Sequence, residues 1–335
     1  MTLRVAINGY GRIGRNVLRA WAEAGAHDEL EFVAINDLGE PEALAHLTRY
    51  DSTHGRFFGE VELDGKELRI DGRCLRLLSE PEPEKLPWKE LKIDVVLECT
   101  GQFRARADAA RHLVAGAGKV IIGAAPFDDV DATVVYGVNH ESLRAEDRII
   151  SSVSCTTQAL AVLVKILDEA FGVESGLMTE IHAMTSDQVV LDRTHRDLRR
   201  GRAAGNNIIP TSSSSIGALR RVLPDVGARI DGYSLRVPTQ NVTVVDFSFI
   251  GRKALTVTAI NDLFAAHAER DSLGVLGFCD ELLVSSDFNH SPYSLIFDAT
   301  ETRVMGRQAK VLIWYDNEWG YANRLLDLCT YLSKR

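Results

Sequence analysis

The chain has 335 residues, a length that favours two domains. Its residues are 45% hydrophobic and 25% charged, a composition typical of globular proteins. Acidic side chains outnumber basic ones by 47 to 38, and the net charge of −9 argues against a nucleic-acid or membrane surface. No apolar run approaches the roughly 20 residues that span a bilayer, and the first residues lack the apolar core of a signal peptide.

The first half of the chain alternates short apolar runs with amphipathic segments. This alternation predicts a parallel sheet with helices on its faces, a doubly wound Rossmann-type domain of the α/β class. A hairpin-like insertion over 61–78, with turns at Asp64-Gly65 and Asp71-Gly72, interrupts the alternation. The predicted strands are 3–8, 31–36, 95–98, 119–122, 132–136 and 148–151, and the predicted helices are 14–24, 40–47 and 104–115.

The second half begins with a long predicted helix and then becomes rich in strands. Its pattern predicts an α+β catalytic domain with a mostly antiparallel sheet. We expect a first domain of residues 1–152 joined by the C-terminal helix 319–335, and a second domain of residues 153–318. The predicted elements are a helix at 156–171, a strand at 176–183, a polar Arg-rich segment at 185–205, strands at 232–237, 242–250, 294–297 and 310–315, and a helix at 319–333.

A glycine-rich run, Gly9-Tyr10-Gly11-Arg12-Ile13-Gly14, follows the first predicted strand and opens a helix. Such glycines permit a tight turn, close approach of the backbone to a pyrophosphate, and packing of the helix on the strand. Asp37 ends the next predicted strand, where a carboxylate binds an adenosine ribose and repels a 2′-phosphate. The run therefore predicts a dinucleotide site that prefers NAD to NADP.

Cys155 lies where a strand gives way to hydroxyl residues and then to a helix. Unpaired backbone N–H groups and the helix dipole favour a thiolate there, although a Cys taken at random is more often a small buried hydrophobe. We interpret Cys155 as a nucleophile whose substrate carries phosphate. The five cysteines are scattered without metal-ligand spacing, which predicts no metal site and favours a reducing, cytoplasmic location over a disulfide framework.

A nucleophilic Cys needs a base, and nine His are available. His182 is the preferred candidate because it ends the strand that returns directly after the Cys155 helix. His54 and His195 are the next candidates, with less topological reason.

Five segments together resemble the phosphorylating, NAD-dependent glyceraldehyde-3-phosphate dehydrogenase family. They occur in that family's order from about residue 3 to the C-terminus. The segments are NGYGRIGR at 8–15, SCTT at 154–157, IHAMTSDQ at 181–188, RVPTQNVTVVD at 236–246 and WYDNEWGYANR at 314–324. DSTHGRF at 51–57, ATVVYGVN at 132–139 and DLRRGRAA at 197–204 also resemble the related erythrose-4-phosphate dehydrogenases.

The resemblance implies that the Cys155 thiolate attacks a sugar-phosphate aldehyde and that His182 is the base. Hydride then passes to NAD, and inorganic phosphate releases 1,3-bisphosphoglycerate from a thioester; in erythrose-4-phosphate dehydrogenases water is the usual acceptor. It also implies a homotetramer. The implied cofactor residues are Gly9, Gly11, Arg12, Ile13, Gly14, Asp37, Thr100, Gly101 and Asn317, and the implied phosphate residues are Ser154, Thr156, Thr185, Arg200, Ser213, Ser214 and Arg236.

Alternatives remain at several of these positions. Arg199 and Arg202 are better interpreted as a solvated face or as subunit ion pairs, and for Arg200 the two roles are equally favoured. Thr185 favours the triose phosphate, because the erythrose-4-phosphate enzymes tend to carry Met there. The chain departs from the family at Ser152, Val153, Gln158, Ala159, Ser213-Ser214 and Gly123-Ala124-Ala125-Pro126, which we interpret as a divergent but active member. The altered flank of Cys155 leaves open a degenerate NAD-binding paralogue without catalysis.

Overall fold

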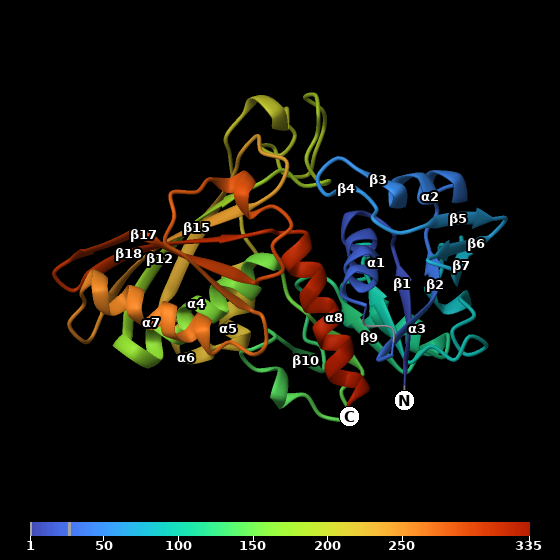
Figure 1. Cartoon of the computed structure of the whole chain (residues 1–335), viewed down its shortest axis with the longest axis horizontal. Coiled ribbons are helices and arrows are strands. Elements are labelled where there is room, and N and C mark those ends of the chain that lie inside the picture. Colours follow the sequence, from blue (N-terminus) through green and yellow to red (C-terminus); the bar gives the residue numbers. More distant parts are fainter. Residues whose placement is uncertain (1, 26–27) are drawn as a thin grey trace. The chain divides into compact units, whose positions relative to one another are not determined.

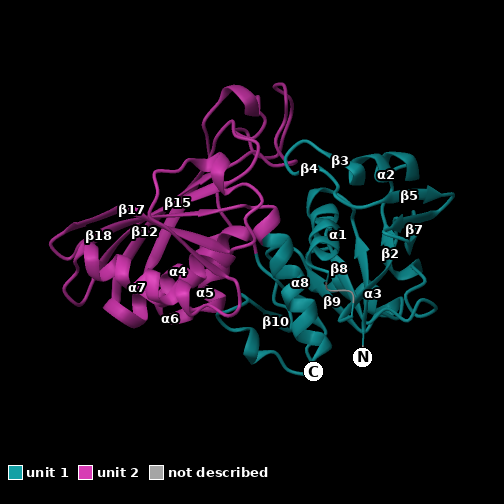
Figure 2. Cartoon of the chain, viewed as in Figure 1, with its two compact units in different colours: residues 1–153, 321–335 teal, residues 154–320 magenta. Residues whose placement is uncertain are grey.

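The computed structural model describes residues 2–25 and 28–335, which form two compact units. Unit 1 comprises residues 1–153 and 321–335, and unit 2 comprises residues 154–320 (Figure 2). Each unit is built around one large sheet with helices packed on it (Figure 1). No helix in the described part of the chain is long and apolar enough to cross a membrane.

Unit 1 contains a nine-stranded sheet in the order β10-β11-β9-β8-β1-β2-β7-β6-β5. Neighbouring strands from β10 to β7 run parallel, which confirms the predicted Rossmann-type sheet. The strands are β1 (Leu3–Asn8), β2 (Leu30–Asn36), β5 (Val61–Asp64), β6 (Glu67–Ile70), β7 (Arg73–Leu78), β8 (Val95–Glu98), β9 (Lys119–Ile122), β10 (Ala132–Thr133) and β11 (Ile149–Ser151), and a separate pair is β3 (Tyr50–Asp51) with β4 (Gly55–Arg56). The helices are α1 (Arg12–Ala24), α2 (Pro41–Arg49), α3 (Arg106–Val114) and α8 (Trp319–Ser333), with short 3-10 turns at Pro83–Lys85 and His140–Ser142.

The predicted insertion at 61–78 is the antiparallel meander β5-β6-β7 at one edge of this sheet. Its turns contain residues with positive φ, namely Gly65 at 58°, Asp71 at 48° and Gly72 at 77°. Turns with positive φ match the right-handed twist of antiparallel strands. They allow the meander to add two antiparallel strands to a sheet whose remaining strand pairs are parallel.

Unit 2 contains a seven-stranded sheet in the order β13-β14-β12-β15-β18-β17-β16. It is mixed: β12 runs parallel to β14 and β16 parallel to β17, whereas the other neighbours are antiparallel. The strands are β12 (Val173–His182), β13 (Ile209–Thr211), β14 (Ile230–Arg236), β15 (Thr243–Gly251), β16 (Leu276–Cys279), β17 (Leu295–Met305) and β18 (Gln308–Tyr315). The helices are α4 (Cys155–Phe171), α5 (Ser215–Val222), α6 (Pro224–Gly227) and α7 (Val257–Glu269), with 3-10 turns at Ala204–Asn206 and Ser285–Phe288.

The sequence pattern did not predict β13, β16, α5, α6 or α7. α7 is hard to detect because only Ile260 and Phe264 are buried on it, which leaves a narrow apolar stripe. β13 and β16 have three and four residues, too few for a period of two to be distinguished from chance. These elements depend on tertiary contacts more than on a strong local signal.

The central strand β12 determines which side chains meet the nucleophile helix. Gly176, Met178, Glu180 and His182 are buried on one face of β12, whereas Leu177 points to the other face and is 67% exposed. Successive strand residues alternate between faces, so Glu180 and His182 share a face by their spacing of two. This spacing positions the site described next.

Candidate active site

Cys155 is the first residue of α4 and faces the end of β12. Ser154 caps the helix, since its hydroxyl accepts the Thr157 backbone N–H at 3.2 Å. The Cys155 Sγ lies 3.7 Å from His182 Nε2, within the range of a sulfur hydrogen bond. The structure therefore brings together the thiol and the His that the sequence singled out. His195, a secondary candidate, instead lies in the polar segment, 3.5 Å from Asp187.

The other ring nitrogen of His182 has two neighbours with opposite requirements. Its Nδ1 lies 2.7 Å from the Ala183 carbonyl oxygen, which only accepts, and 2.7 Å from Arg236 Nη1, which only donates. A protonated Nδ1 satisfies the carbonyl, and an unprotonated Nδ1 satisfies the guanidinium. Neither tautomer satisfies both, so the position of the ring proton depends on where the Arg236 side chain is engaged.

Burial acts on both reactive groups in the direction that keeps them neutral. Burial, reinforced by the Glu180 carboxylate, raises the pKa of the Cys155 thiol to about 12. Burial, reinforced by the Arg236 guanidinium, lowers the pKa of His182 to about 4. Cys155 retains partial exposure. Both shifts favour a neutral thiol beside a neutral imidazole, and they oppose the preference for a thiolate that the N-terminus of α4 provides.

A buried chain of hydroxyls and one carboxylate lies beneath the pair. The Tyr315 hydroxyl donates to Thr156 Oγ1 at 2.8 Å, and Thr156 Oγ1 donates to Glu180 Oε1 at 2.5 Å. The same Glu180 oxygen lies 3.8 Å from His182 Nε2. The Thr156 hydroxyl, an expected phosphate ligand, is thus used within the protein and is only 2% exposed.

Glu180 was not among the residues expected from the sequence. Its signal was present, because a charged residue at an inward position of a strand, two before the candidate base, breaks the pattern of buried apolar residues. The identity of its partners could not be predicted in this way, since Thr156 and Tyr315 belong to a helix and a distant strand.

The other expected phosphate residues lie around the β13-β14-β12 edge of the sheet. Arg236 ends β14 and pairs in register with His182. Arg200 is held by other protein groups, donating from Nε to Thr211 Oγ1 at 2.9 Å and from Nη1 to Asp187 at 2.6 Å. Arg202 pairs with Asp192 at 2.9 Å, and both side chains are exposed, as expected of the solvated face proposed for it.

Two further segments border this edge of the sheet. Thr185 follows the end of β12, and its backbone N–H donates to the Gln188 side chain at 3.2 Å. Ser213 and Ser214 follow β13 at the start of α5, with the Ser213 hydroxyl 2.6 Å from that of Ser215. Ser214 is exposed and makes no side-chain cap. These positions suit anion binding through backbone N–H groups and hydroxyls.

Asn317, the residue expected to hold the nicotinamide amide, is buried after β18. Its side-chain oxygen accepts the Thr243 hydroxyl at 2.9 Å, and Thr243 Oγ1 in turn accepts the Ala183 backbone N–H at 3.4 Å. These bonds set the orientation of the Asn317 amide, so its NH2 group is the end that remains to donate to a carbonyl. The same bonds connect Asn317 to the residue beside His182.

In unit 1, two positions of the glycine turn, Gly9 and Gly14, have no room for a side chain. Gly9 has a φ of 91°, and a Cβ there would lie 2.6 Å from the Thr100 nitrogen. A Cβ on Gly14 would lie 2.3 Å from the Gly9 oxygen. Gly11 differs, because nothing in the described protein lies within 4 Å of its Cβ position. That open space lies at the N-cap of α1, where unpaired backbone N–H groups favour an anion.

Asp37 follows β2, and its carboxylate is bound to the turn. It accepts the Tyr10 backbone N–H at 2.7 Å and the Gly39 backbone N–H at 2.9 Å. The Arg12 side chain turns to Asp51 and, together with backbone N–H groups, holds the pKa of that carboxyl at about 2. Ile13 is half-buried within α1. Arg12 and Ile13 are therefore expected near the cofactor only through their place in the glycine turn. Asp37 is the polar side chain expected to bind the ribose.

Thr100 and Gly101 follow β8 at the same carboxyl edge of the parallel sheet. The Thr100 backbone N–H donates to Glu98 at 2.8 Å, and its hydroxyl donates to the same oxygen. Gly101 has a φ of 71° and is exposed. In open parallel sheets, ligands bind beyond the carboxyl ends of the strands, as expected for these residues.

Two departures near Cys155 are buried. Val153 has a φ of 50°, a strained conformation for a β-branched residue, and its carbonyl accepts the Tyr321 hydroxyl at 2.9 Å. Gln158, 1% exposed, lies one turn into α4. Backbone strain of this kind concentrates near functional sites.

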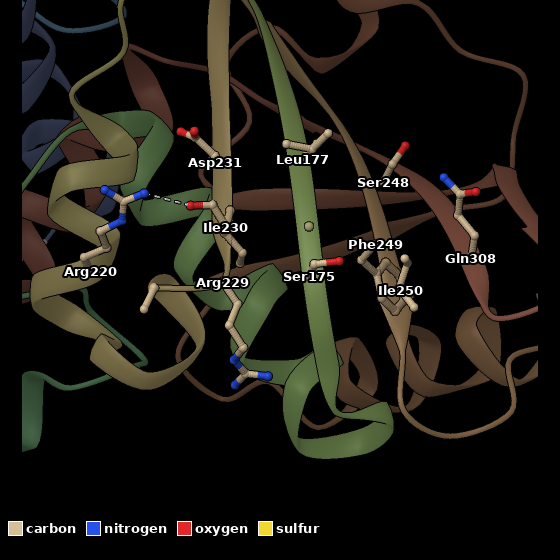
Figure 3. Close-up of a pocket in the computed structure, with 12 residues that line it drawn as sticks. Ser175, Leu177, Arg220, Arg229, Ile230, Asp231, Ser248, Phe249, Ile250 and Gln308 are labelled. Carbon is tan, nitrogen blue, oxygen red and sulfur yellow. Dashed lines mark hydrogen bonds between the residues drawn. The ribbon is translucent and has the colours of Figure 1, made fainter.

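A cavity of about 510 Å³ lies elsewhere, on the opposite face of the unit 2 sheet. Leu177, Asp231 and Ile250 line it, and Figure 3 shows them on three neighbouring strands with Arg220 at one side. Because Leu177 alternates with Met178 and Glu180, this cavity is separated from Cys155 by the sheet itself. None of the expected site residues lines it.

Comparison with known proteins agrees with this geometry. Residues 3–106 match the family model described as the NAD binding domain of glyceraldehyde 3-phosphate dehydrogenase, and residues 154–317 match its C-terminal domain. The chain is 53% identical over 333 residues to the plasmid glyceraldehyde-3-phosphate dehydrogenase of Cupriavidus necator, covering 99% of both chains. It is 49% identical to the enzyme of Xanthobacter flavus, over 100% of this chain and 99% of that one, and 50% identical to that of Pseudomonas aeruginosa, over 99% of both. The chain therefore belongs to the glyceraldehyde-3-phosphate dehydrogenase family and is an NAD-dependent oxidoreductase.

Proposed function

We propose that the protein oxidises glyceraldehyde 3-phosphate, in the presence of inorganic phosphate, to 1,3-bisphosphoglycerate. The observation that carries this proposal is the 3.7 Å approach of Cys155 Sγ to His182 Nε2, in a chain of this family. Residues 153–318 provide the chemistry, and residues 1–152 with the helix 319–335 form the NAD-binding domain, to which Asn317 of the catalytic domain adds a contact with the nicotinamide.

The reaction begins at the thiol. The Cys155 proton moves to His182 Nε2, and the sulfur attacks the aldehyde carbon to form a thiohemiacetal. His182 returns this proton to the new alkoxide and then accepts the hydroxyl proton as the carbon is oxidised. NAD bound through Gly9, Gly11, Gly14, Asp37, Thr100, Gly101 and Asn317 supplies the hydride acceptor.

The product of this oxidation is a thioester on Cys155. Phosphate oxygen attacks the thioester carbon, the C–S bond breaks, and the sulfur leaves as a thiolate that is reprotonated. The Cys155 backbone N–H at the start of α4 stabilises the oxyanion of both tetrahedral intermediates. Water as the acceptor would release a free acid instead, which is the outcome typical of erythrose-4-phosphate dehydrogenases.

The charged ends of the substrate need cations and neutral donors. Arg236 is the strongest candidate, because it lies beside His182 and its Nε has no hydrogen-bond partner in the described protein. Ser154, Thr185, Ser213 and Ser214 supply backbone and hydroxyl donors at neighbouring element ends, whereas Thr156 is left with its backbone N–H because its hydroxyl is bonded to Glu180. Arg200 joins them if phosphate displaces its bond to Asp187.

The test is a paired assay of NAD reduction with purified protein. Glyceraldehyde 3-phosphate and erythrose 4-phosphate are each supplied with and without inorganic phosphate, and absorbance at the NADH band is followed. We expect rapid turnover of the triose phosphate that requires phosphate. Turnover restricted to erythrose 4-phosphate and independent of phosphate would overturn the proposal, and the absence of any turnover would favour a non-catalytic paralogue.

We also propose a homotetramer in a reducing, cytoplasmic environment. Leu177, Tyr233 and Ile250 are 67%, 56% and 38% exposed on one face of the unit 2 sheet, an apolar surface suited to another subunit. All five cysteines are free, as expected where thiols stay reduced. Light scattering checks the assembly, and a monomeric mass would contradict it.

A further inference from the structure

Glu180 is a buried carboxylate with an unusual balance of partners. It is 2% exposed, and its Oε1 accepts the Thr156 hydroxyl. Its second oxygen, Oε2, is buried and has no hydrogen-bond partner in the described part of the chain. Leaving a buried carboxylate oxygen unpaired is costly, so a purely structural role, as an acceptor for Thr156, does not account for the acid at this position.

The charged groups around the thiol explain why a carboxylate is useful there. Arg236 ends β14 beside His182 Nδ1, and Arg200 also opposes a positive charge on the ring. The Tyr315 hydroxyl faces the cluster from β18, and burial raises its pKa well above the usual range, so it stays neutral. Glu180 is therefore the acidic group that balances the Arg236 cation beside Cys155 and His182.

The balance matters when the thiol reacts. As the S–H bond breaks and the proton bonds to His182 Nε2, the electron pair stays on sulfur and the ring becomes an imidazolium. That cation lies between Arg236, which repels it, and the Glu180 carboxylate, whose Oε1 is 3.8 Å from Nε2. With Glu180 present, the cluster is neutral before and after the transfer. Without it, the cluster carries one excess positive charge and loses a proton more readily.

We propose that Glu180 is a positioning residue that retains a proton on the Cys155–His182 pair by stabilising the imidazolium form of His182. The role deepens the proposed function, on which it rests for its place in the reaction. It acts on the pair itself, so it is also measurable in protein without any substrate.

The experiment compares the wild type with Glu180→Gln, which keeps the shape of the side chain and removes its charge. The rate of Cys155 alkylation by iodoacetamide is measured against pH in the NAD-free protein. Neutral Gln no longer stabilises the imidazolium or opposes the thiolate, so both apparent ionisations of the pair move to lower pH, by about one unit each. Glu180→Asp retains the charge, and its alkylation profile is expected to stay close to that of the wild type.

Glu98→Gln is the matched control, because it removes a carboxylate that is equally buried in unit 1. It should leave the alkylation profile of Cys155 unchanged. If Glu180→Gln does not fold, Glu180→Met, which has a similar volume and no charge, provides the same measurement. An unchanged profile in a folded, uncharged Glu180 variant would overturn the inference.

Turnover gives a second, separable readout. In Glu180→Gln, kcat is expected to fall by about ten-fold, because His182 becomes a weaker base, and the acid limb of its pH profile should move to lower pH. If the wild type fails to oxidise the triose phosphate while the alkylation shift is observed, the proposed function is wrong and the role of Glu180 stands. If the wild type oxidises the triose phosphate normally and Glu180→Gln shifts neither pH profile, the proposed function stands and the role of Glu180 is wrong.

Discussion

Each unit buries one glutamate against one histidine, and the two pairs differ in how completely they are hydrogen-bonded. In unit 1, His112 Nε2 lies 3.1 Å from Glu98, and the Trp88 indole N–H donates to His112 Nδ1 at 3.0 Å. Asn8 and Thr100 donate to the two oxygens of Glu98. Trp88 requires an unprotonated Nδ1, so the ring proton of His112 resides on Nε2, which lies 3.1 Å from Glu98 and a longer 3.4 Å from the Asn8 side-chain nitrogen that itself donates to Glu98.

The pair in unit 2 has no such unique arrangement. His182 Nδ1 faces a donor and an acceptor at once, and one oxygen of Glu180 lacks a partner in the described residues. A fully satisfied network holds each proton in one place, whereas a partly satisfied one leaves a proton able to move at low cost. The comparison teaches that burial of a Glu–His pair does not by itself mark a reactive site. A reactive site is indicated instead by incomplete hydrogen bonding of such a pair beside a nucleophile.

The strongest way to break the comparison is to remove each histidine in turn. His182→Gln should lower kcat by about 10²- to 10⁴-fold, because it removes the proton acceptor for Cys155. His112→Gln should leave kcat within a few-fold of the wild type. Steady-state NAD reduction measures both, with NAD binding by calorimetry as the control for folding of unit 1. Equal losses in the two variants would contradict the distinction.

The pH dependence of stability provides a second test. The pKa of His182 falls from 6.5 to about 4 on folding, so the unfolded chain binds more protons than the folded one between these values. The stability that neutral His182 contributes is present above pH 6.5 and is lost as the pH falls toward 4, a loss on the order of a few kcal/mol. Urea unfolding at a series of pH values should therefore show a flatter loss in His182→Gln than in the wild type. Parallel curves would show that His182 is not buried in its neutral form.

Removal of each carboxylate should affect stability unequally. Glu98→Gln leaves donors from Asn8 and His112 facing an amide, and we expect it to cost about 1–3 kcal/mol of unfolding free energy. Glu180→Gln should cost less, since one of its oxygens has no described partner to lose. Urea unfolding near neutral pH measures both values. A larger loss for Glu180→Gln would reverse the assignment of the two pairs.

The smallest expected effect concerns the guanidinium beside His182. Arg236→Lys keeps the charge but loses the planar fork that binds phosphate through two hydrogen bonds. We expect KM for the sugar phosphate to rise by about ten-fold with a smaller change in kcat, which corresponds to one lost charge-assisted hydrogen bond. Arg202→Lys, at a surface ion pair, is the matched control and should leave KM unchanged. An unchanged KM in Arg236→Lys would remove Arg236 from the substrate site.

Most of the fold was predictable because its signals are local. The strand–helix alternation of unit 1, the meander at 61–78 and the helix at 319–333 follow from periodicity and turn residues over short stretches. The unpredicted elements of unit 2 are short or weakly patterned. The strand expected at 132–136 is only Ala132–Thr133, because it lies at the edge of the sheet and its one neighbour, β11, ends at Ser151, the partner of Thr133.

The sequence by itself determined the chemical identities: the glycine turn with Asp37, the thiol at a helix start, and a histidine at the end of the following strand. Only the tertiary structure decided the environment of that thiol. Arg236 reaches His182 across 54 residues because β14 pairs with β12, and Tyr315 reaches Thr156 across 159 residues. Strand pairing and register determine which distant side chains meet, and burial then acts on their charges. Short-range sequence patterns contain no information about strand pairing or burial, so the approach of Cys155 to His182 and the Glu180 carboxylate beside them emerged only from the folded chain.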